Sequence, residues 1–176
     1  MKPPLKIAVV GPESTGKTTL TQKLADFFHT SFAQEVARDY LHTLKRPYTQ
    51  PDLTQIARLQ LAEEKRAEQN AREVFFADTN LLVIKVWSEY KYQSCDPWIL
   101  ENMKLDTYDV HFLTGTDIPW EEDPLREHPE QRDDLYEIYR RELSRAGVLF
   151  YELKGNAEQR LSDAVIVIRI LLATYR

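Results

Sequence analysis

The sequence has few of the features that mark secreted or membrane-embedded proteins. Its 176 residues include one cysteine, Cys95, which cannot form a disulfide within the chain and which we interpret as a small buried apolar residue. The longest apolar run, Ala164 to Ala173, is interrupted by Arg169 and is too short to cross a bilayer. Because residues 1–4 lead into an apolar strand without a signal sequence, we expect a cytoplasmic protein that does not bind membranes.

Basic residues are scarce relative to acidic ones. The chain carries 23 lysine and arginine residues against 28 aspartate and glutamate residues, which gives a net charge of −5. This balance argues against nucleic acid as a partner, because binding to nucleic acid depends on positive charge placed against phosphates. A polyanionic ligand must therefore bind at a local cluster of basic groups. The sequence leaves the oligomeric state open, a homo-oligomer included.

Glycine is also rare, yet two of the five glycines stand in residues 11–18, GPESTGKT. This segment matches the phosphate-binding pattern G-x-x-x-x-G-K-[ST] and has the required strand before it and helix after it. Such a loop binds phosphates through its backbone N–H groups, while Lys17 adds positive charge and the Thr18 hydroxyl binds Mg²⁺. We therefore assign ATP binding to Gly11, Glu13, Ser14, Thr15, Gly16, Lys17, Thr18 and Thr19.

Strand and helix patterns alternate along the chain. This alternation predicts an α/β fold of one domain, residues 1–176, in which a parallel sheet is covered by helices on both faces. The expected strands are 5–10, 31–33, 74–78, 110–113 and 148–153, and the expected helices include 36–44, a long helix from 51, 81–92, one ending at 147, and about 157–174.

A proline-rich stretch, residues 115–132, separates the fourth strand from the next helix. Long ordered loops in compact domains usually serve function, and this loop follows a strand that neighbours the phosphate-binding loop. We predict that it is a lid over the nucleotide. Its arginines, Arg126 and Arg132, are predicted to stabilise the transferred phosphoryl group, with pairing to nearby carboxylates as the alternative.

Acidic side chains supply the remaining catalytic candidates. Asp78 ends an apolar strand, where it is predicted to hold Mg²⁺, with helix capping as the alternative. Helical spacing predicts that Glu35, Arg38 and Asp39 share one polar face, so that a carboxylate takes the proton of an acceptor hydroxyl and the arginine binds substrate. The alternative is a solvated helix face with weak ion pairs.

Aromatic and amide side chains are candidates for contact with the acceptor. Trp87 is interpreted as a core residue, whereas Trp120, in the loop, is the better ligand candidate. Gln60 interrupts an apolar stripe and is a candidate for hydrogen bonding to substrate, with a partly exposed glutamine as the alternative. Tyr40 and Trp98 are further rings for stacking.

Five stretches carry a resemblance to a known family: GPESTGKT at 11–18, EVARDYL at 35–41, DT at 78–79, DIPW at 117–120 and DPLREHP at 123–129. Together they resemble the ribosylnicotinamide kinase domain of NadR-like proteins, over nearly the whole chain. The resemblance implies a P-loop nucleoside kinase fold with strand order 2-3-1-4-5. It also implies phosphorylation of the ribose 5′-hydroxyl of nicotinamide riboside, a small-molecule nucleoside, with ATP and Mg²⁺.

The same resemblance assigns roles to particular residues. It implies that Glu35 or Asp39 faces the ribose, that Arg126 and Arg132 belong to a lid, and that Gly155 and Asn156 lie near adenine. Two features depart from the NadR pattern: no H-x-G-H adenylyl-transfer motif occurs, and Gln34 stands where some members have an aromatic residue. Kinases of other nucleosides or small molecules, and a nucleotide-sensing regulatory ATPase, remain alternatives. A GTPase is rejected because no N-K-x-D motif follows a late strand.

Overall fold

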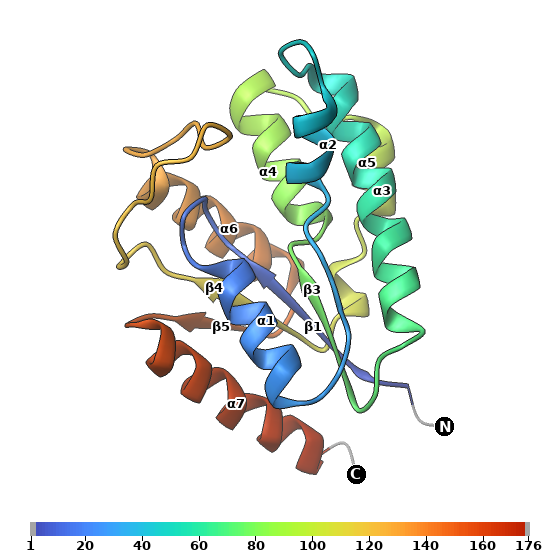
Figure 1. The fold of residues 1–176 in the computed structure, drawn as a ribbon, viewed down its shortest axis with the longest axis vertical. Coiled ribbons are helices and arrows are strands. Elements are labelled where there is room, and N and C mark those ends of the chain that lie inside the picture. The colour runs from blue at the N-terminus through green and yellow to red at the C-terminus, as the bar shows by residue number, and fades with distance from the viewer. Residues whose placement is uncertain (1–2, 175–176) are drawn as a thin grey trace.

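Five parallel strands form the centre of the structure, a computed structural model that describes residues 3–174 (Figure 1). The strands are β1 (Leu5–Val10), β2 (Phe32–Ala33), β3 (Val74–Asp78), β4 (Val110–Thr114) and β5 (Phe150–Leu153). Their order is β2-β3-β1-β4-β5, so the predicted order is confirmed. Because β1 is central, Ile7 is paired with both Phe76 and Val110.

The central strands are apolar on both faces because helices cover both sides of the sheet. Leu5, Ile7 and Val9 of β1 pack in one core cluster, whereas Ala8 and Val10 pack in another on the opposite face. This alternation follows from the two-residue period of a strand, and burial on both faces is typical of parallel sheets.

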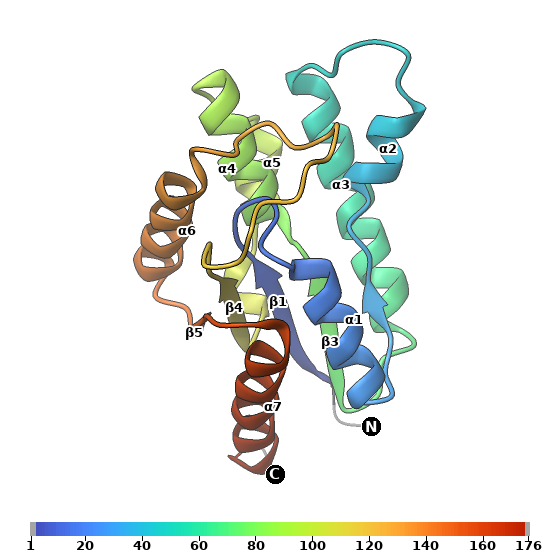
Figure 2. The same ribbon diagram turned by 60° about the vertical axis from the view of Figure 1, so that its left-hand side comes forward.

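Two helices cover one face of the sheet, and the others cover the opposite face or its upper edge. Figures 1 and 2 show α1 (Lys17–Phe27) and α7 (Ala157–Thr174) on the first face. The opposite face carries α3 (Gln50–Glu68), α4 (Leu81–Tyr92) and α6 (Arg132–Ala146). Two short helices, α2 (Ala37–Thr43) and α5 (Pro97–Asn102), and the 3₁₀ turn η1 (Leu105–Thr107) complete the described elements.

Local sequence signals set several helix boundaries. Thr49 and Asp52 form a capping box at the start of α3, and the Asn80 side chain accepts a hydrogen bond from the backbone N–H of Leu82 at the start of α4. Gly147, with φ 65°, ends α6 as predicted. Several predicted boundaries are wrong by one or two residues: β5 begins at Phe150 instead of 148, β2 at Phe32 instead of 31, α3 at Gln50 instead of 51, and α2 at Ala37 instead of 36.

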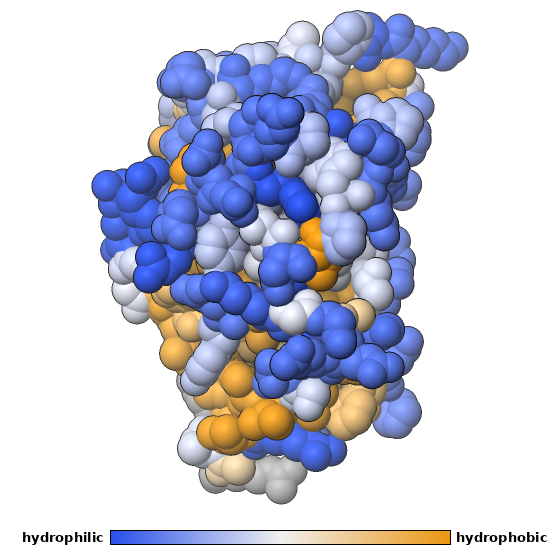
Figure 3. Space-filling view, turned by 90° about the vertical axis from the view of Figure 1, so that its left-hand side faces the viewer, coloured by the Kyte–Doolittle hydropathy of each residue, from blue (hydrophilic) through white to orange (hydrophobic). Residues whose placement is uncertain are grey.

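The surface differs between the two ends of the sheet. Figure 3 shows polar side chains over the upper part of one face and apolar side chains gathered lower down, where α7 and β5 lie. The exposed large apolar residues at this end are Leu149, Tyr151, Ile166 and Ile170. Among the described helices, none combines the length and the apolar character needed to span a membrane.

Candidate active site

The phosphate-binding loop connects β1 to α1 at the carboxyl end of the sheet. Gly11 has φ 144°, and a Cβ atom there would lie 2.6 Å from Thr114 Oγ1, so only glycine lets the loop pack this closely on β4. The Thr15 hydroxyl donates to the Pro12 carbonyl at 2.7 Å and lies 2.6 Å from the Thr114 hydroxyl. The loop is therefore held in a defined shape by side chains from its own turn and from β4.

Lys17 lies at the bottom of this loop. Its Nζ donates to the Pro12 carbonyl at 2.7 Å. Burial lowers the pKa of Lys17, and the negative charges of Glu35 and Asp78 act in the opposite direction. The lysine is thus a cation close to these two carboxylates, within reach of phosphates bound by the loop.

Asp78 is the last residue of β3 and is 1% exposed. Burial raises the pKa of its carboxyl to about 6, and the neighbouring Glu35 charge acts in the same direction. Asp78 accepts a hydrogen bond from the Thr18 side chain, while its Oδ1 has no hydrogen-bond partner. A hydroxyl and an unpartnered carboxylate oxygen at the end of the phosphate-binding loop are ligands that suit Mg²⁺. Within residues 3–174, no group of three or more His, Cys, Asp or Glu could hold a metal alone, so phosphate and water would supply the other ligands.

A cleft of about 390 Å³ opens above the phosphate-binding loop. Its lining includes the loop itself, Glu35 and Arg38 beside β2, one face of α4, Tyr139 of α6, and residues of the 115–131 loop. The cleft also reaches Ala157 at the start of α7. The cleft therefore combines a loop suited to phosphates with a carboxylate and aromatic side chains.

Glu35 is held in the cleft by a buried side chain of α3. Gln60, 1% exposed, accepts a hydrogen bond from the Val36 backbone N–H at 3.1 Å and donates to the Gln34 carbonyl at 3.2 Å. These two bonds fix the connection between β2 and α2 on both sides of Glu35. Gln60 is therefore a buried support for this connection, and in this structure it does not line the cleft.

The expectation that Glu35, Arg38 and Asp39 share one helix face is wrong. Because α2 begins at Ala37, Glu35 lies outside the helix, and only Glu35 and Arg38 line the cleft. Asp39 is exposed and borders a shallow groove between α2 and α3, together with Tyr40, whose hydroxyl donates to Asp52 at 3.0 Å. The structure therefore places Asp39 and Tyr40 away from the phosphate-binding loop.

The 115–131 loop is anchored on the phosphate-binding loop. Glu13 Oε2 accepts hydrogen bonds from the backbone N–H groups of Glu127, at 3.0 Å, and His128, at 3.2 Å. Ser14 Oγ accepts from the Glu121 N–H at 2.9 Å and from Arg126 at 3.3 Å. In this structure Glu13 and Ser14 thus bind the neighbouring loop, in addition to the role in ATP binding predicted for them.

The two predicted arginines occupy different positions in this arrangement. Arg126 lines the cleft and donates to the Glu121 carbonyl. Arg132 is the first residue of α6 and donates to the carbonyls of Ser14 and Ile118, each at 3.0 Å. Arg132 therefore joins the two loops, and Arg126 alone of the pair faces the cleft.

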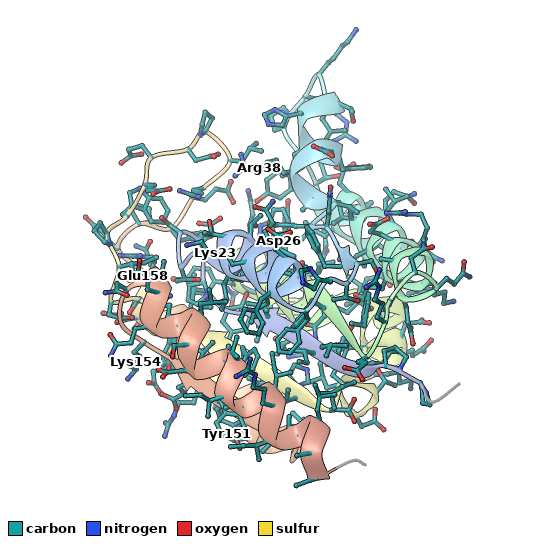
Figure 4. All side chains as sticks on the ribbon, turned by 60° about the horizontal axis from the view of Figure 1, so that its bottom comes forward. Lys23, Asp26, Arg38, Tyr151, Lys154 and Glu158 are labelled. Atoms are coloured by element: carbon teal, nitrogen blue, oxygen red, sulfur yellow. The ribbon has the colours of Figure 1, made fainter. Side chains whose placement is uncertain are left out.

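Two ion pairs connect the 115–131 loop to the elements across the cleft. Arg38 of α2 pairs with Asp123 at 2.7 Å, and Figure 4 shows Arg38 between α2 and this loop. Lys91 of α4 pairs with Glu127 at 2.8 Å. The loop thus bridges the opening between the phosphate-binding loop and the upper helices.

The aromatic residues of the cleft come from α4 and α6. Trp87, interpreted from sequence as a core residue, is half-buried and lines the cleft with Tyr90 and Tyr139. Its Nε1 donates to the Tyr48 hydroxyl at 2.9 Å, which fixes the indole ring. Residues 83, 86, 87 and 90 all line the cleft and follow the i, i+3, i+4, i+7 spacing of one helix face. That stripe, directly after Asp78, is the signal by which sequence could have found Trp87.

The two other tryptophans lie outside the cleft lining. Trp98 belongs to α5, where the Arg58 guanidinium lies 4.0 Å from its ring centroid. Trp120 lies in the 115–131 loop beside Arg132, whose guanidinium is 5.7 Å from the ring centroid. Neither ring lines the cleft in this structure, whereas Trp87 and Tyr90 of α4 do.

The turn between β5 and α7 borders the cleft. Asn156 Oδ1 accepts a hydrogen bond from the Gln159 N–H, and the Gly155 carbonyl accepts from Arg160. Ala157 and Arg160 line the cleft, whereas Gly155 and Asn156 lie just beside it. Their predicted proximity to adenine stays a prediction. Arg160 was not among the residues predicted from sequence.

Comparison with known proteins identifies a matching family model and several similar proteins. A family model described as an AAA domain matches residues 6–160. Over 127 residues the chain is 29% identical to the trifunctional NAD biosynthesis/regulator protein NadR of Salmonella typhimurium, an alignment that covers 68% of this chain and 30% of that protein. The chain thus spans about a third of the length of this curated relative. The resemblance to NadR-like proteins predicted from the motifs is confirmed.

Solved structures of NadR share this fold. A NadR crystal structure in complex with NAD and AMP-PNP superposes with a TM-score of 0.78 at 22% identity, covering 94% of this chain and 49% of that one. A NadR structure in complex with NR superposes with a TM-score of 0.77 at 21% identity, covering 94% of this chain and 51% of that one. At these identities the likeness establishes the fold, a P-loop kinase fold.

Proposed function

The chain belongs to the AAA domain family, and on that premise we propose that it is an ATP- and Mg²⁺-dependent kinase of nicotinamide riboside. The reaction transfers the γ-phosphoryl group of ATP to the ribose 5′-hydroxyl and yields nicotinamide mononucleotide and ADP. The likeness to NadR, which has been solved with NR and with NAD and AMP-PNP, supports both the donor and the acceptor.

The observation that carries the proposal is a cleft in which the phosphate-binding loop is joined by side chains of a different chemistry. The loop and Lys17 line this cleft together with the Glu35 carboxylate and the rings of Trp87 and Tyr90. A protein that only binds or hydrolyses a nucleotide needs no second group of side chains of this kind. A carboxylate beside the phosphate-binding loop is what an acceptor hydroxyl requires.

The phosphate-binding loop binds and orients ATP. Backbone N–H groups of residues 13–16 and the start of α1 would bind the phosphates, with Lys17 as the fixed positive charge. Thr18 and Asp78 would hold Mg²⁺, which when bound neutralises part of the charge on the phosphates.

Glu35 is the proposed general base. The oxygen of the 5′-hydroxyl forms a bond to the γ-phosphorus while the bond from that phosphorus to the β,γ-bridging oxygen breaks, and Glu35 accepts the hydroxyl proton. ADP leaves with the electrons of the broken bond. Lys17 and Arg126 both line the cleft and stabilise the negative charge on the phosphoryl group that is being transferred. Arg132 joins the two loops near these residues.

The carboxylate and the rings of the cleft suit a cationic aromatic ring. Nicotinamide riboside carries a positively charged pyridinium, which is attracted both to a carboxylate and to the faces of aromatic rings. Glu35 provides the carboxylate, and Trp87, Tyr90 and Tyr139 provide the rings. In our proposal these rings replace the aromatic residue that some NadR-like proteins have at the position of Gln34.

The experiment that tests the kinase proposal compares the wild type with Lys17→Ala. Purified protein, ATP, Mg²⁺ and nicotinamide riboside are incubated, and nicotinamide mononucleotide is measured by mass spectrometry. We expect the wild type to form the product and Lys17→Ala to lose nearly all turnover with an unchanged circular dichroism spectrum, because the lysine side chain donates its hydrogen bond to a carbonyl of its own loop and belongs to no core cluster among the described residues. Lys65→Ala, at an exposed position of α3, is the control and should retain full activity.

Near-normal turnover by Lys17→Ala would show that the phosphate site is assigned wrongly. Steady ATP hydrolysis by the wild type, at a rate that no nucleoside changes, would favour a nucleotide-sensing ATPase instead of a kinase.

A further inference from the structure

Arg160 is a buried arginine at the junction of three loops. It lies in the first turn of α7 and is 3% exposed. Side chains on a helix lean toward its N-terminus, so the Arg160 guanidinium reaches back past the start of α7. Burial of an arginine is unusual unless its charge and its N–H groups are paired.

Four hydrogen bonds hold the guanidinium in place. Nη1 donates to the Thr15 carbonyl at 2.7 Å, and Nε donates to the Gly155 carbonyl at 2.8 Å. Nη2 donates to the Gly115 carbonyl at 3.1 Å and to Asp117 Oδ1 at 2.6 Å. These acceptors belong to the phosphate-binding loop, the start of the 115–131 loop and the turn between β5 and α7. One side chain therefore connects three of the loops around the cleft.

The bond to Thr15 constrains the part of the phosphate-binding loop that contacts phosphate. In a trans peptide the carbonyl of one residue and the N–H of the next point in opposite directions. Because Arg160 holds the Thr15 carbonyl, the Gly16 N–H is directed away from the guanidinium. Gly16 precedes Lys17 and the start of α1, where backbone N–H groups bind phosphate. The orientation of this peptide thus depends on Arg160.

Asp117 completes the arrangement from the other side. Its Oδ1 accepts from Arg160, and its Oδ2 accepts from the Gly155 N–H at 2.5 Å. The carboxylate therefore neutralises the buried guanidinium and ties the beginning of the 115–131 loop to the turn after β5. Lysine could not reproduce this geometry, because an ammonium group lacks the planar fork that reaches several acceptors at once.

We propose that Arg160 is a positioning residue for the nucleotide: it orients the Thr15–Gly16 peptide toward the phosphates and couples that peptide to the 115–131 loop and to the turn at Gly155. The proposal rests on the ATP-binding part of the proposed function and is independent of the acceptor. It predicts that loss of the guanidinium weakens ATP binding specifically, beyond any effect on folding.

The test measures the ATP dissociation constant of Arg160→Met by calorimetry, with no acceptor present. We expect the constant to rise by at least about tenfold, which matches the loss of a few charge-assisted hydrogen bonds. In kinase assays the KM for ATP should rise similarly, while the KM for the nucleoside stays within about twofold of the wild type. If Arg160 only stabilised the fold, Arg160→Met would lower the unfolding temperature without producing this difference between the two KM values.

Arg140→Met is the matched control. Arg140 of α6 also binds a carboxylate, that of Glu152 in β5 at 2.9 Å, but it is half-exposed and has no bond to the phosphate-binding loop. This variant should bind ATP as the wild type does. Folded Arg160→Met that binds ATP within about twofold of the wild type would overturn the proposal.

If Arg160→Met does not fold, Arg160→Lys provides a second test. This variant retains the positive charge but loses the planar set of N–H donors of the guanidinium group, so we expect the ATP dissociation constant to rise by at least about threefold. An unchanged constant would overturn the proposal. Because binding is measured without a nucleoside, weakened ATP binding in these variants would support the role of Arg160 even if the wild type phosphorylated no nucleoside.

Discussion

At the scale of single residues, Glu35 and Asp39 have different surroundings although both were candidates for the base. Glu35 lines the cleft, where its charge opposes the lowering of the Lys17 pKa by burial and adds to the raising of the Asp78 pKa by burial. Asp39 is exposed in the shallow groove between α2 and α3. The difference arises because Glu35 precedes the helix and Asp39 belongs to it. Sequence spacing alone could not separate them, since the helix boundary decides where each side chain lies.

We therefore predict that Glu35→Gln lowers kcat by about 10²-fold or more, as removal of a general base does, whereas Asp39→Asn changes it by no more than about twofold. Both variants replace a carboxylate with an amide of the same shape, so each serves as the control for the other. The measurement is kcat with saturating ATP and nicotinamide riboside. An equal loss in the two variants, or a larger loss in Asp39→Asn, would contradict the assignment of Glu35 as the base.

The raised pKa of Asp78 leads to a prediction about how the stability of the protein depends on pH. Burial raises its pKa in the folded protein to about 6 from an ordinary value of 3.8, so ionisation is less favourable in the folded state than in the unfolded state. Ionised Asp78 therefore destabilises the ligand-free protein. This destabilisation reaches its full size above about pH 6 and disappears as the pH falls below about 4.

We predict that Asp78→Asn raises the free energy of unfolding at pH 8 by up to about 3 kcal/mol, and at pH 5 by about half as much. Urea unfolding of both proteins without nucleotide or metal measures this difference. The variant should also need more Mg²⁺ for half-maximal turnover. The same stability change at both pH values, with an unaltered Mg²⁺ titration, would contradict both the raised pKa of Asp78 and its assignment to the Mg²⁺ site.

At the scale of elements, α3 supports the active site through Gln60. The side-chain amide satisfies both backbone groups that flank Glu35, from a helix that approaches the carboxyl end of β2. Gln60→Leu removes both bonds, so the Val36 N–H and the Gln34 carbonyl lose their partner in α3. We predict a fall in kcat of about tenfold or more, because the proposed base is no longer held in position.

Gln69→Leu is the matched control for this prediction, because Gln69 is exposed at the end of the same helix. Its kcat should equal that of the wild type. If folded Gln60→Leu kept the wild-type kcat, the connection between β2 and α2 would not depend on Gln60 for its position.

The elements differ in how well sequence predicted them. The helices α4 and α7, the five strands and the strand order followed from periodicity, turn residues and family resemblance. The start of α2 did not, because residues 34–36 are held outside the helix by Gln60, which lies 24 residues or more away in sequence. A contact of that kind leaves no local pattern.

The residues of the site were likewise predictable only where a local sequence pattern marks them. The phosphate-binding loop has a fixed spacing and was found directly. By contrast, the position of Trp87 in the cleft depends on how α4 packs against the rest of the sheet, and the position of Arg160 depends on three loops meeting. Arg160 also looks like an ordinary helical arginine in sequence. Only its burial identifies it.

At the scale of the whole molecule, an acidic chain concentrates positive charge where the phosphates would bind. The net charge is −5, yet Lys17, Arg126 and Arg160 all line the same cleft. The same cleft is also lined by the Glu35 carboxylate and by the rings of Trp87, Tyr90 and Tyr139. This combination predicts that the protein selects a cationic acceptor as well as an anionic donor.

The measurement that tests this account most directly is the ratio of kcat/KM values for nicotinamide riboside and for neutral pyrimidine nucleosides, with ATP and Mg²⁺ held constant. The account predicts that kcat/KM for nicotinamide riboside is at least about tenfold above the values for uridine, cytidine and thymidine, because only the cationic ring interacts favourably with both Glu35 and the aromatic rings. Equal or faster turnover of any of these neutral nucleosides would contradict the nicotinamide assignment.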